Sequence, residues 1–245
     1  MPIVVGTSGW QYRDWRGPLY PPDLPQRDWL EYYASQYATV ENNSTFYRLP
    51  TRDTFAGWQA RIPGDFVMTI KASRYLTHVR RLRDPEEPVA KLMAAAAGLG
   101  GRLGPVLLQL PPSLRADPEL LDRALGQFPA GVRVVVEPRH PSWWSDRVRD
   151  VLTARRAALC WADRAGQAIT PLWRTADWGY LRFHEGAAKP WPRYRDQDLR
   201  RWADLVSRTW PADEPVFAYF NNDQRVAAPA DAAAFALLTG NQARG

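Results

Sequence analysis

The chain has 245 residues, of which 45% are hydrophobic and 24% are charged, and its formal net charge at pH 7 is +6. These proportions are typical of a folded globular protein, and they exclude the collagen-like, coiled-coil and disordered classes. Its apolar runs are much shorter than the roughly 18 residues that span a bilayer, so we expect no membrane association.

The cysteine content and the first residues indicate a cellular location. The single cysteine, Cys160, can form no internal disulfide, and residues 1–6 lack the charged start and cleavage site of a signal peptide. We therefore expect a cytoplasmic protein in which Cys160 is a buried core side chain. The positive charge favours anionic partners, although most basic residues are scattered as on a solvated surface.

Short β-branched or apolar runs recur about every 30 residues, which is the length of one strand-and-helix unit. The predicted strands are Ile3–Gly6, Thr39–Asn43, Phe66–Lys71, Pro105–Leu110, Val132–Glu137, Ala157–Trp161, Trp178–His184 and Pro215–Asn221. These runs predict eight strands in chain order.

The segments between these strands show helical spacing and capping residues. Asp117 is a candidate N-cap, with Pro118 at the first helical position. Further along, one helical face carries Leu199, Trp202, Val206 and Trp210. A last helix is expected to open at Pro229 and to stop near Gly240.

Eight alternating units predict one (β/α)8 TIM-type barrel that comprises residues 1–245 as a single domain. The rival fold is a doubly wound open sheet, whose phosphate loop would follow the first strand as Gly-x-Gly-x-x-Gly. This chain has Gly6-Thr7-Ser8-Gly9-Trp10 at that position, and no break in composition marks a second domain. The sequence therefore favours the barrel.

Reactive side chains follow the ends of the predicted strands, where the active sites of barrels lie. The candidate catalytic residues are Glu41, Lys71, His78, Glu137, His140 and His184. The candidate substrate-binding residues are Trp10, Tyr12, Asn43, Arg74, Gln109, Arg139, Asp163, Arg182, Tyr219 and Asn221. Any one of them could be an ordinary polar group at a strand end, but burying the whole set without a ligand would be unfavourable.

The residue types suggest how such a site would work. Arginine side chains such as Arg139 and Arg182 bind phosphate or carboxylate through their planar fork. Glu41 and Glu137 form a candidate acid/base pair, with histidines able to transfer protons near neutral pH. A desolvated Lys71 would have a lowered pKa, so that it could act as a base or form a Schiff base.

Seven blocks of this sequence, in order along the chain, resemble the YecE-like family (domain of unknown function 72). They are residues 7–17 (TSGWQYRDWRG), 39–47 (TVENNSTFY), 71–78 (KASRYLTH), 103–112 (LGPVLLQLPP), 136–143 (VEPRHPSW), 180–184 (YLRFH) and 219–223 (YFNND). The chain departs from the family pattern at Asn42, where an apolar residue is usual, and at Glu185, where glycine is frequent. The resemblance implies a TIM-type barrel and supplies no reaction.

We therefore expect a metal-independent acid/base enzyme that binds an anionic small molecule, such as a sugar phosphate or nucleotide, and needs no cofactor. A hydrolase, lyase or isomerase is the expected reaction class. Three alternatives remain open at this point. They are a metal-dependent hydrolase or isomerase, a glycosidase that uses Glu41 and Glu137, and a nucleic-acid-binding module without catalysis. The last is less favoured, because the chain has no basic stripe and no recognised module.

Overall fold

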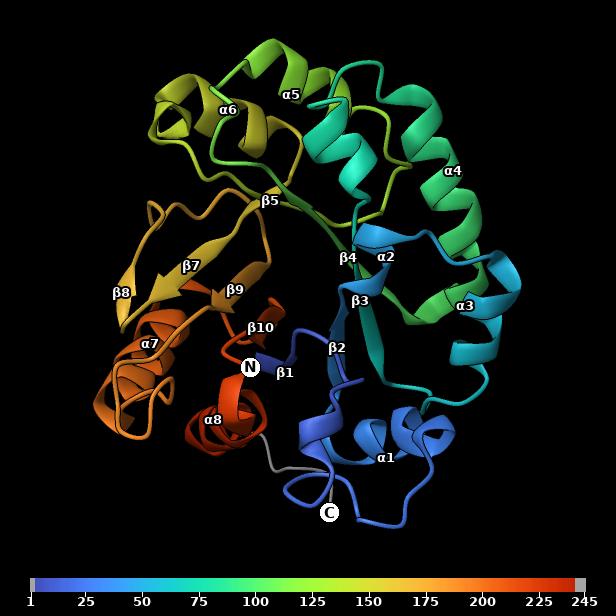
Figure 1. Cartoon of the computed structure of the whole chain (residues 1–245). Coiled ribbons are helices and arrows are strands. Elements are labelled where there is room, and N and C mark those ends of the chain that lie inside the picture. The colour runs from blue at the N-terminus through green and yellow to red at the C-terminus, as the bar shows by residue number, and fades with distance from the viewer. Residues whose placement is uncertain (1–2, 241–245) are drawn as a thin grey trace.

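The computed structural model describes residues 3–240, in which one curled ten-stranded sheet is surrounded by helices (Figure 1). The strands are β1 (Ile3–Thr7), β2 (Thr39–Asn42), β3 (Val67–Lys71), β4 (Leu103–Gln109), β5 (Val134–Glu137), β6 (Ala158–Leu159), β7 (Trp161–Arg164), β8 (Gln167–Ala168), β9 (Gly179–Phe183) and β10 (Val216–Phe220). Every predicted strand region contains a strand of the sheet, which confirms the predicted positions.

The helices lie outside the sheet; α5 begins at Pro118 as predicted, whereas α8 begins at Ala227, two residues before the predicted start at Pro229. They are α1 (Trp29–Gln36), α2 (Ser44–Tyr47), α3 (Arg52–Gln59), α4 (Glu86–Ala96), α5 (Pro118–Leu125), α6 (Asp146–Ala154), α7 (Asp196–Thr209) and α8 (Ala227–Leu238). The Asp117 carboxylate accepts the backbone N–H of Leu120 at 2.9 Å, which confirms the predicted cap. Within residues 3–240, no helix is long and apolar enough to span a membrane.

The regular closed ring of eight strands that we expected is not observed. The strand order is β6-β5-β4-β3-β2-β1-β10-β9-β7-β8, an open sheet in which all ladders are parallel except β7–β8. The cause is the predicted strand 157–161, which divides at Cys160 into β6, paired with β5, and β7, paired with β9. The curled sheet is therefore a half-barrel with helices on its convex face.

The hairpin of β7 and β8 was not predicted, because its turn lacks the usual residues. Ala165 and Gly166 connect the strands with φ angles of +57° and +77°. Such turns favour Asn-Gly, so alanine at the first position conceals the signal.

Side chains alternate between the two faces of the sheet, as the period of two in a strand requires. On β3, Met68 and Ile70 pack against the helices, whereas Val67 belongs to a second apolar cluster on the concave face. That concave cluster comprises Leu107, Val135, Ala158, Cys160, Ala162, Trp178, Tyr180, Phe217 and Tyr219. We call this cluster the floor of the site, because the site residues lie beyond it toward the C-terminal ends of the same strands.

Candidate active site

The site lies on the concave face, at the C-terminal ends of β2, β3, β5 and β9. Glu137 and Arg182 point to the same face as Val135 and Tyr180, which lie two positions earlier on the same strands and belong to the floor. Because the strands of β6–β5–β4–β3–β2–β1–β10–β9–β7 are parallel, these ends meet at one edge. Strand alternation therefore brings together residues that are far apart in the sequence.

Arg182 occupies the centre of the site and joins two buried carboxylates. Its Nη2 donates to Glu41 Oε1 at 2.7 Å, and its Nη1 donates to Glu137 Oε2 at 2.6 Å. Both carboxylates are fully buried, and Arg182 is 1% exposed. Glu41 also accepts from Ser8 Oγ at 2.7 Å and from the Tyr180 hydroxyl at 2.5 Å. We call Arg182, Glu41 and Glu137 the ion triad; most of its polar atoms form hydrogen bonds within the protein.

Glu137 receives three further hydrogen bonds from the neighbouring strand ends. Gln109 Nε2 donates to Oε2 at 2.8 Å, while Arg139 Nη2 and His184 Nε2 donate to Oε1 at 2.7 and 2.8 Å. Burial alone would raise the pKa of Glu137, but the surrounding positive charges, Arg182 foremost, hold it well below the usual range. Glu137 is therefore an ionised anchor across the pH range of cells.

His184 is neutral and held in one tautomer. Because a carboxylate can only accept, the Nε2 atom that contacts Glu137 carries the proton, which leaves Nδ1 to accept from Asn221 Nδ2 at 3.2 Å. Burial lowers the pKa of His184 in spite of the adjacent carboxylate of Glu137. Both ring nitrogens are thus occupied by residues of the chain itself.

Lys71 differs from the other cations of the site because it has no partner of opposite charge. Among residues 3–240, no hydrogen bond or ion pair involves its Nζ atom, which lies over the Phe46 ring, 4.3 Å from the centroid. The residue is 9% exposed. Burial and the charge of Arg182 lower the pKa of Lys71 to about 8. At pH 7 about one tenth of an amine with such a pKa is unprotonated, so it can exchange a proton readily near neutral pH.

Seven polar side-chain atoms among residues 3–240 are buried without a hydrogen-bond partner, and three of them belong to candidate site residues. These three are Asn43 Oδ1, Arg139 Nε and Arg182 Nε. Buried polar atoms are nearly always paired in folded proteins, so each such atom requires an explanation. All three follow or lie on strands whose C-terminal ends form the site, so a ligand bound there could supply their partners.

His78 and Arg74 lie at the rim of the site. His78 lies edge-on to the Phe46 ring at 5.0 Å, and its Nδ1 contacts Thr77 Oγ1 at 2.9 Å. Burial, followed by the charges of Lys71 and Arg74, lowers the pKa of His78. Arg74 itself is exposed.

Two predicted aromatic residues lie at the edge and at the floor of the site. The Tyr12 hydroxyl donates to the Ser8 carbonyl at 2.6 Å, close to Glu41. The Tyr219 hydroxyl lies below the ion triad, hydrogen-bonded to Thr39 and Thr69 at 2.7 and 2.8 Å. Tyr12 can reach a ligand, whereas Tyr219 supports the floor.

The structure does not bring His140 or Asp163 to this site. Trp10 is buried edge-on against Trp58, and it lines a small pocket with Tyr12 and Asn43 at the edge of the site. His140 Nδ1 accepts from the backbone N–H of Ser142 at 3.1 Å and so caps a short helical turn. Asp163 faces α7, where it accepts from Trp202 Nε1 at 2.8 Å, because alternation directs its neighbour Ala162 to the concave face.

Sequence reasoning missed Phe46 and Tyr180, which contact Lys71 and Glu41 directly. Tyr180 could have been found, because it lies two residues before Arg182 on the same strand and so shares its face. Phe46 belongs to the short helix α2, and no pattern in the sequence predicts its approach to Lys71. Across residues 3–240, the His, Cys, Asp and Glu side chains form no group of three that could hold a metal ion.

Comparison with known proteins gives one family for the whole chain. Residues 4–245 match the model of the family described as "Protein of unknown function DUF72". The UPF0759 protein YecE of Escherichia coli K12 is 32% identical over 121 residues, a stretch that spans 47% of this chain and 43% of YecE. The UPF0759 protein YunF of Bacillus subtilis is 24% identical over 257 aligned positions, covering 90% of this chain and 89% of YunF.

Solved structures of the same family share the fold. A DUF72 family protein from Thermotoga maritima superposes with a TM-score of 0.84 at 25% identity, covering 97% of this chain and 99% of that one. Another from Enterococcus faecalis gives 0.80 at 18% identity, covering 98% and 96%. The curled sheet is therefore an architecture that this chain has in common with them.

Proposed function

This chain belongs to the DUF72 family, and we propose that it is a metal-independent enzyme that binds an anionic small molecule at the C-terminal ends of its strands and transfers a proton through Lys71. The observation that carries this proposal is the Lys71 amine, which is buried over Phe46 and has no carboxylate partner. A lysine buried without a counter-ion is unfavourable to folding, so its retention fits a role toward a ligand.

The charges of the site suit an anion. Two carboxylates, Glu41 and Glu137, meet three permanent or partial cations, Lys71, Arg139 and Arg182. Since Arg182 binds both carboxylates and Arg139 uses Nη2 on Glu137, Lys71 and the remaining N–H groups of Arg139 are left to bind a phosphate or carboxylate group. Arg139 is 26% exposed in its side chain, so one side of its guanidinium can reach a ligand.

Lys71 is the group best suited to move a proton. Its pKa of about 8 lies close to neutral pH, where general acid/base catalysis is most efficient. His184 is saturated by Glu137 and Asn221, so we assign it a positioning role. Asn43, with an unpartnered Oδ1, would orient the substrate by accepting a hydrogen bond from it.

The glycosidase alternative has less support from this geometry. A glycosidase needs one protonated carboxylic acid beside the bond that breaks. Glu137 is held ionised by its cations, and the guanidinium of Arg182 fills the space between Glu137 and Glu41. A metal ion would compete with Arg182 for the same two carboxylates and would face the repulsion of Lys71 and Arg139.

We further infer that the half-barrel works as an irregular TIM-type barrel. The two ends of the sheet order, β6 and the β7–β8 hairpin, are separated in the chain by Cys160 alone. The backbone N–H of Cys160 donates to Val136 at 2.9 Å, so this segment touches β5 on one side and continues into the partner of β9 on the other. The site then lies where barrel enzymes have theirs.

The test is the binding of inorganic phosphate and ribose 5-phosphate, measured by calorimetry and by the shift of the unfolding midpoint. The wild type should bind, and Lys71→Met should bind at least about tenfold more weakly. Arg155→Met is the control, because Arg155 is an exposed cation that pairs with Asp122 and does not line the site. Equal binding to the wild type and Lys71→Met, or no binding of any anion, would contradict the proposal.

A further inference from the structure

A groove of about 490 Å³ opens beside the candidate active site, between α2, the helical turn at Tyr75–Val79 and α4. Its lining includes Phe46, Tyr47, Arg74, Tyr75, Val79 and Lys91. The volume lies within the range of small-molecule sites. The turn at Tyr75–Val79 is a single π-helical turn, an element that is frequent at functional sites.

The groove presents aromatic and apolar side chains to solvent. Tyr47 is 81% exposed, Tyr75 is 53% exposed and Val79 is 56% exposed. Three large side chains exposed within one concave surface are unusual for an ordinary solvated face, because apolar area is otherwise removed from water. Tyrosine rings are well suited to stack on a flat ring of a ligand.

The groove borders the site, and the buried ring of Phe46 lies between them. The Phe46 ring lies 4.3 Å from Lys71 Nζ and 5.1 Å from the Tyr47 ring, measured between centroids for the two rings. A ligand whose anionic group contacts Lys71 has to extend past this one ring to reach Tyr47. The site at Lys71 is charged, and the groove at Tyr47 and Tyr75 is aromatic.

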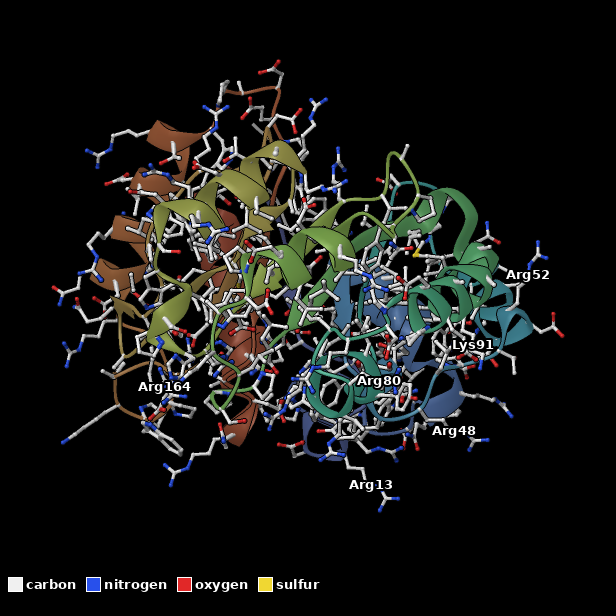
Figure 2. All side chains as sticks on the ribbon, turned by 90° about the horizontal axis from the view of Figure 1, so that it is seen from above. Arg13, Arg48, Arg52, Arg80, Lys91 and Arg164 are labelled. Carbon is white, nitrogen blue, oxygen red and sulfur yellow. The ribbon has the colours of Figure 1, made fainter. Side chains whose placement is uncertain are left out.

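The walls of the groove keep positive charge available. Arg48 and Arg74 form no ion pair with any residue between 3 and 240, and both are exposed. Arg48, Arg80 and Lys91 lie on the same side of the molecule (Figure 2), but Arg80 and Lys91 already pair with Asp84 and Glu87. Of these cations, the two left without an ion pair are therefore Arg74 in the lining and Arg48, which follows Tyr47 in the chain. A neutral apolar ligand would gain nothing from these cations, whereas an anion with a planar ring would use both features.

We propose that the anionic ligand of this site is a nucleotide, with its phosphate at Lys71 and its base in the groove against Tyr47 and Tyr75. This inference rests on the proposed function, because it names the substrate class of the same site. A sugar phosphate has no flat ring for the tyrosines, and it would leave the groove empty. Glu87, which lines the groove, can accept a hydrogen bond from an exocyclic amine of the base.

The experiment compares four probes by calorimetry: adenosine monophosphate, ribose 5-phosphate, inorganic phosphate and adenosine. Adenosine monophosphate should bind at least about tenfold more tightly than ribose 5-phosphate, and Tyr47→Ala or Tyr75→Ala should remove most of that difference. Binding of ribose 5-phosphate to these variants should stay within about twofold of the wild type. Leu237→Ala, at an apolar position on α8 that is 69% exposed, is the matched control.

The outcomes separate this inference from the proposed function. Equal binding of adenosine monophosphate and ribose 5-phosphate, unaffected by the tyrosine variants, would overturn the nucleotide and leave the anion site in place. Binding of adenosine that needs the two tyrosines, with no binding of phosphate or ribose 5-phosphate, would support the groove and refute the anion site. A change in oligomeric state caused by Tyr47→Ala, with unchanged nucleotide affinity, would make the groove a protein interface and overturn the inference.

Discussion

Replacing Lys71 with methionine removes a buried cation that has no carboxylate partner, and we expect this change to stabilise the fold near neutral pH. The pKa of Lys71 falls from 10.5 to about 8 on folding, mainly because of burial. Each pKa unit corresponds to about 1.4 kcal/mol, so charging Lys71 in the folded state costs about 3 kcal/mol. This cost is net of the interactions that favour the charge, so removing the amine should gain about 3 kcal/mol near pH 7.

The gain has a defined pH dependence. Below the folded-state pKa of about 8, Lys71 is charged in both states and its full cost is present. As the pH rises from about 8 to 10.5, the folded state loses the proton first, so the wild type gains stability relative to the variant. The advantage of Lys71→Met should therefore shrink across this window and be nearly absent above it.

Urea unfolding of the wild type, Lys71→Met and the exposed-lysine control Lys91→Met, near pH 7 and near pH 10, measures both effects. The control should differ from the wild type by less than about 0.5 kcal/mol, because its partner Glu87 is also exposed. The reasoning fails if Lys71→Met is less stable than the wild type near pH 7, or if its advantage is the same at both pH values.

Three other substitutions test the site and the fold. Arg182→Ala leaves Glu41 and Glu137 buried without their shared cation, and should lower the free energy of unfolding by about 3–5 kcal/mol in urea; a loss below about 1 kcal/mol would contradict the triad. Asp117→Ala removes the cap of α5 and should cost about 1 kcal/mol, read from the thermal midpoint, whereas Asp117→Asn should cost much less. Burial raises the pKa of Asp223 to about 6, so Asp223→Asn should stabilise by about 1 kcal/mol near pH 7, after a discount for partial exposure. That gain should vanish as the pH falls from 6 to 3.8, and a carboxyl resonance that titrates near pH 4 would show that the pKa is not raised.

The sequence predicted the strands well because buried parallel strands carry a strong apolar signal. It also placed Glu41, Lys71, Glu137 and Arg182 at one edge, since parallel strands share the direction of their ends. These predictions needed only the position of each strand end. No knowledge of contacts between distant side chains was required.

Predictions that depended on the direction of a side chain were less successful. Asp163 follows Ala162 on β7, and one step along a strand reverses the face, so its carboxylate meets α7 instead of the site. His140 precedes Pro141, and the pair forms the start of a helical turn that uses the imidazole as a cap. Tryptophans contribute mainly to the core, since Trp15, Trp29 and Trp161 are among the most deeply buried side chains.

The contacts of Arg182 have a consequence for the order in which the chain is made. This residue lies 141 positions after Glu41 and 45 positions after Glu137, so both acidic groups leave the ribosome before their shared cation. A nascent chain that ends before β9 holds two carboxylates aimed at the same concave face with no guanidinium between them. Glu137 can already pair with Arg139 in such a chain, whereas Glu41 lacks its hydrogen-bonded cation. The burial of Glu41 therefore becomes favourable only after β9, which carries Arg182, has been made.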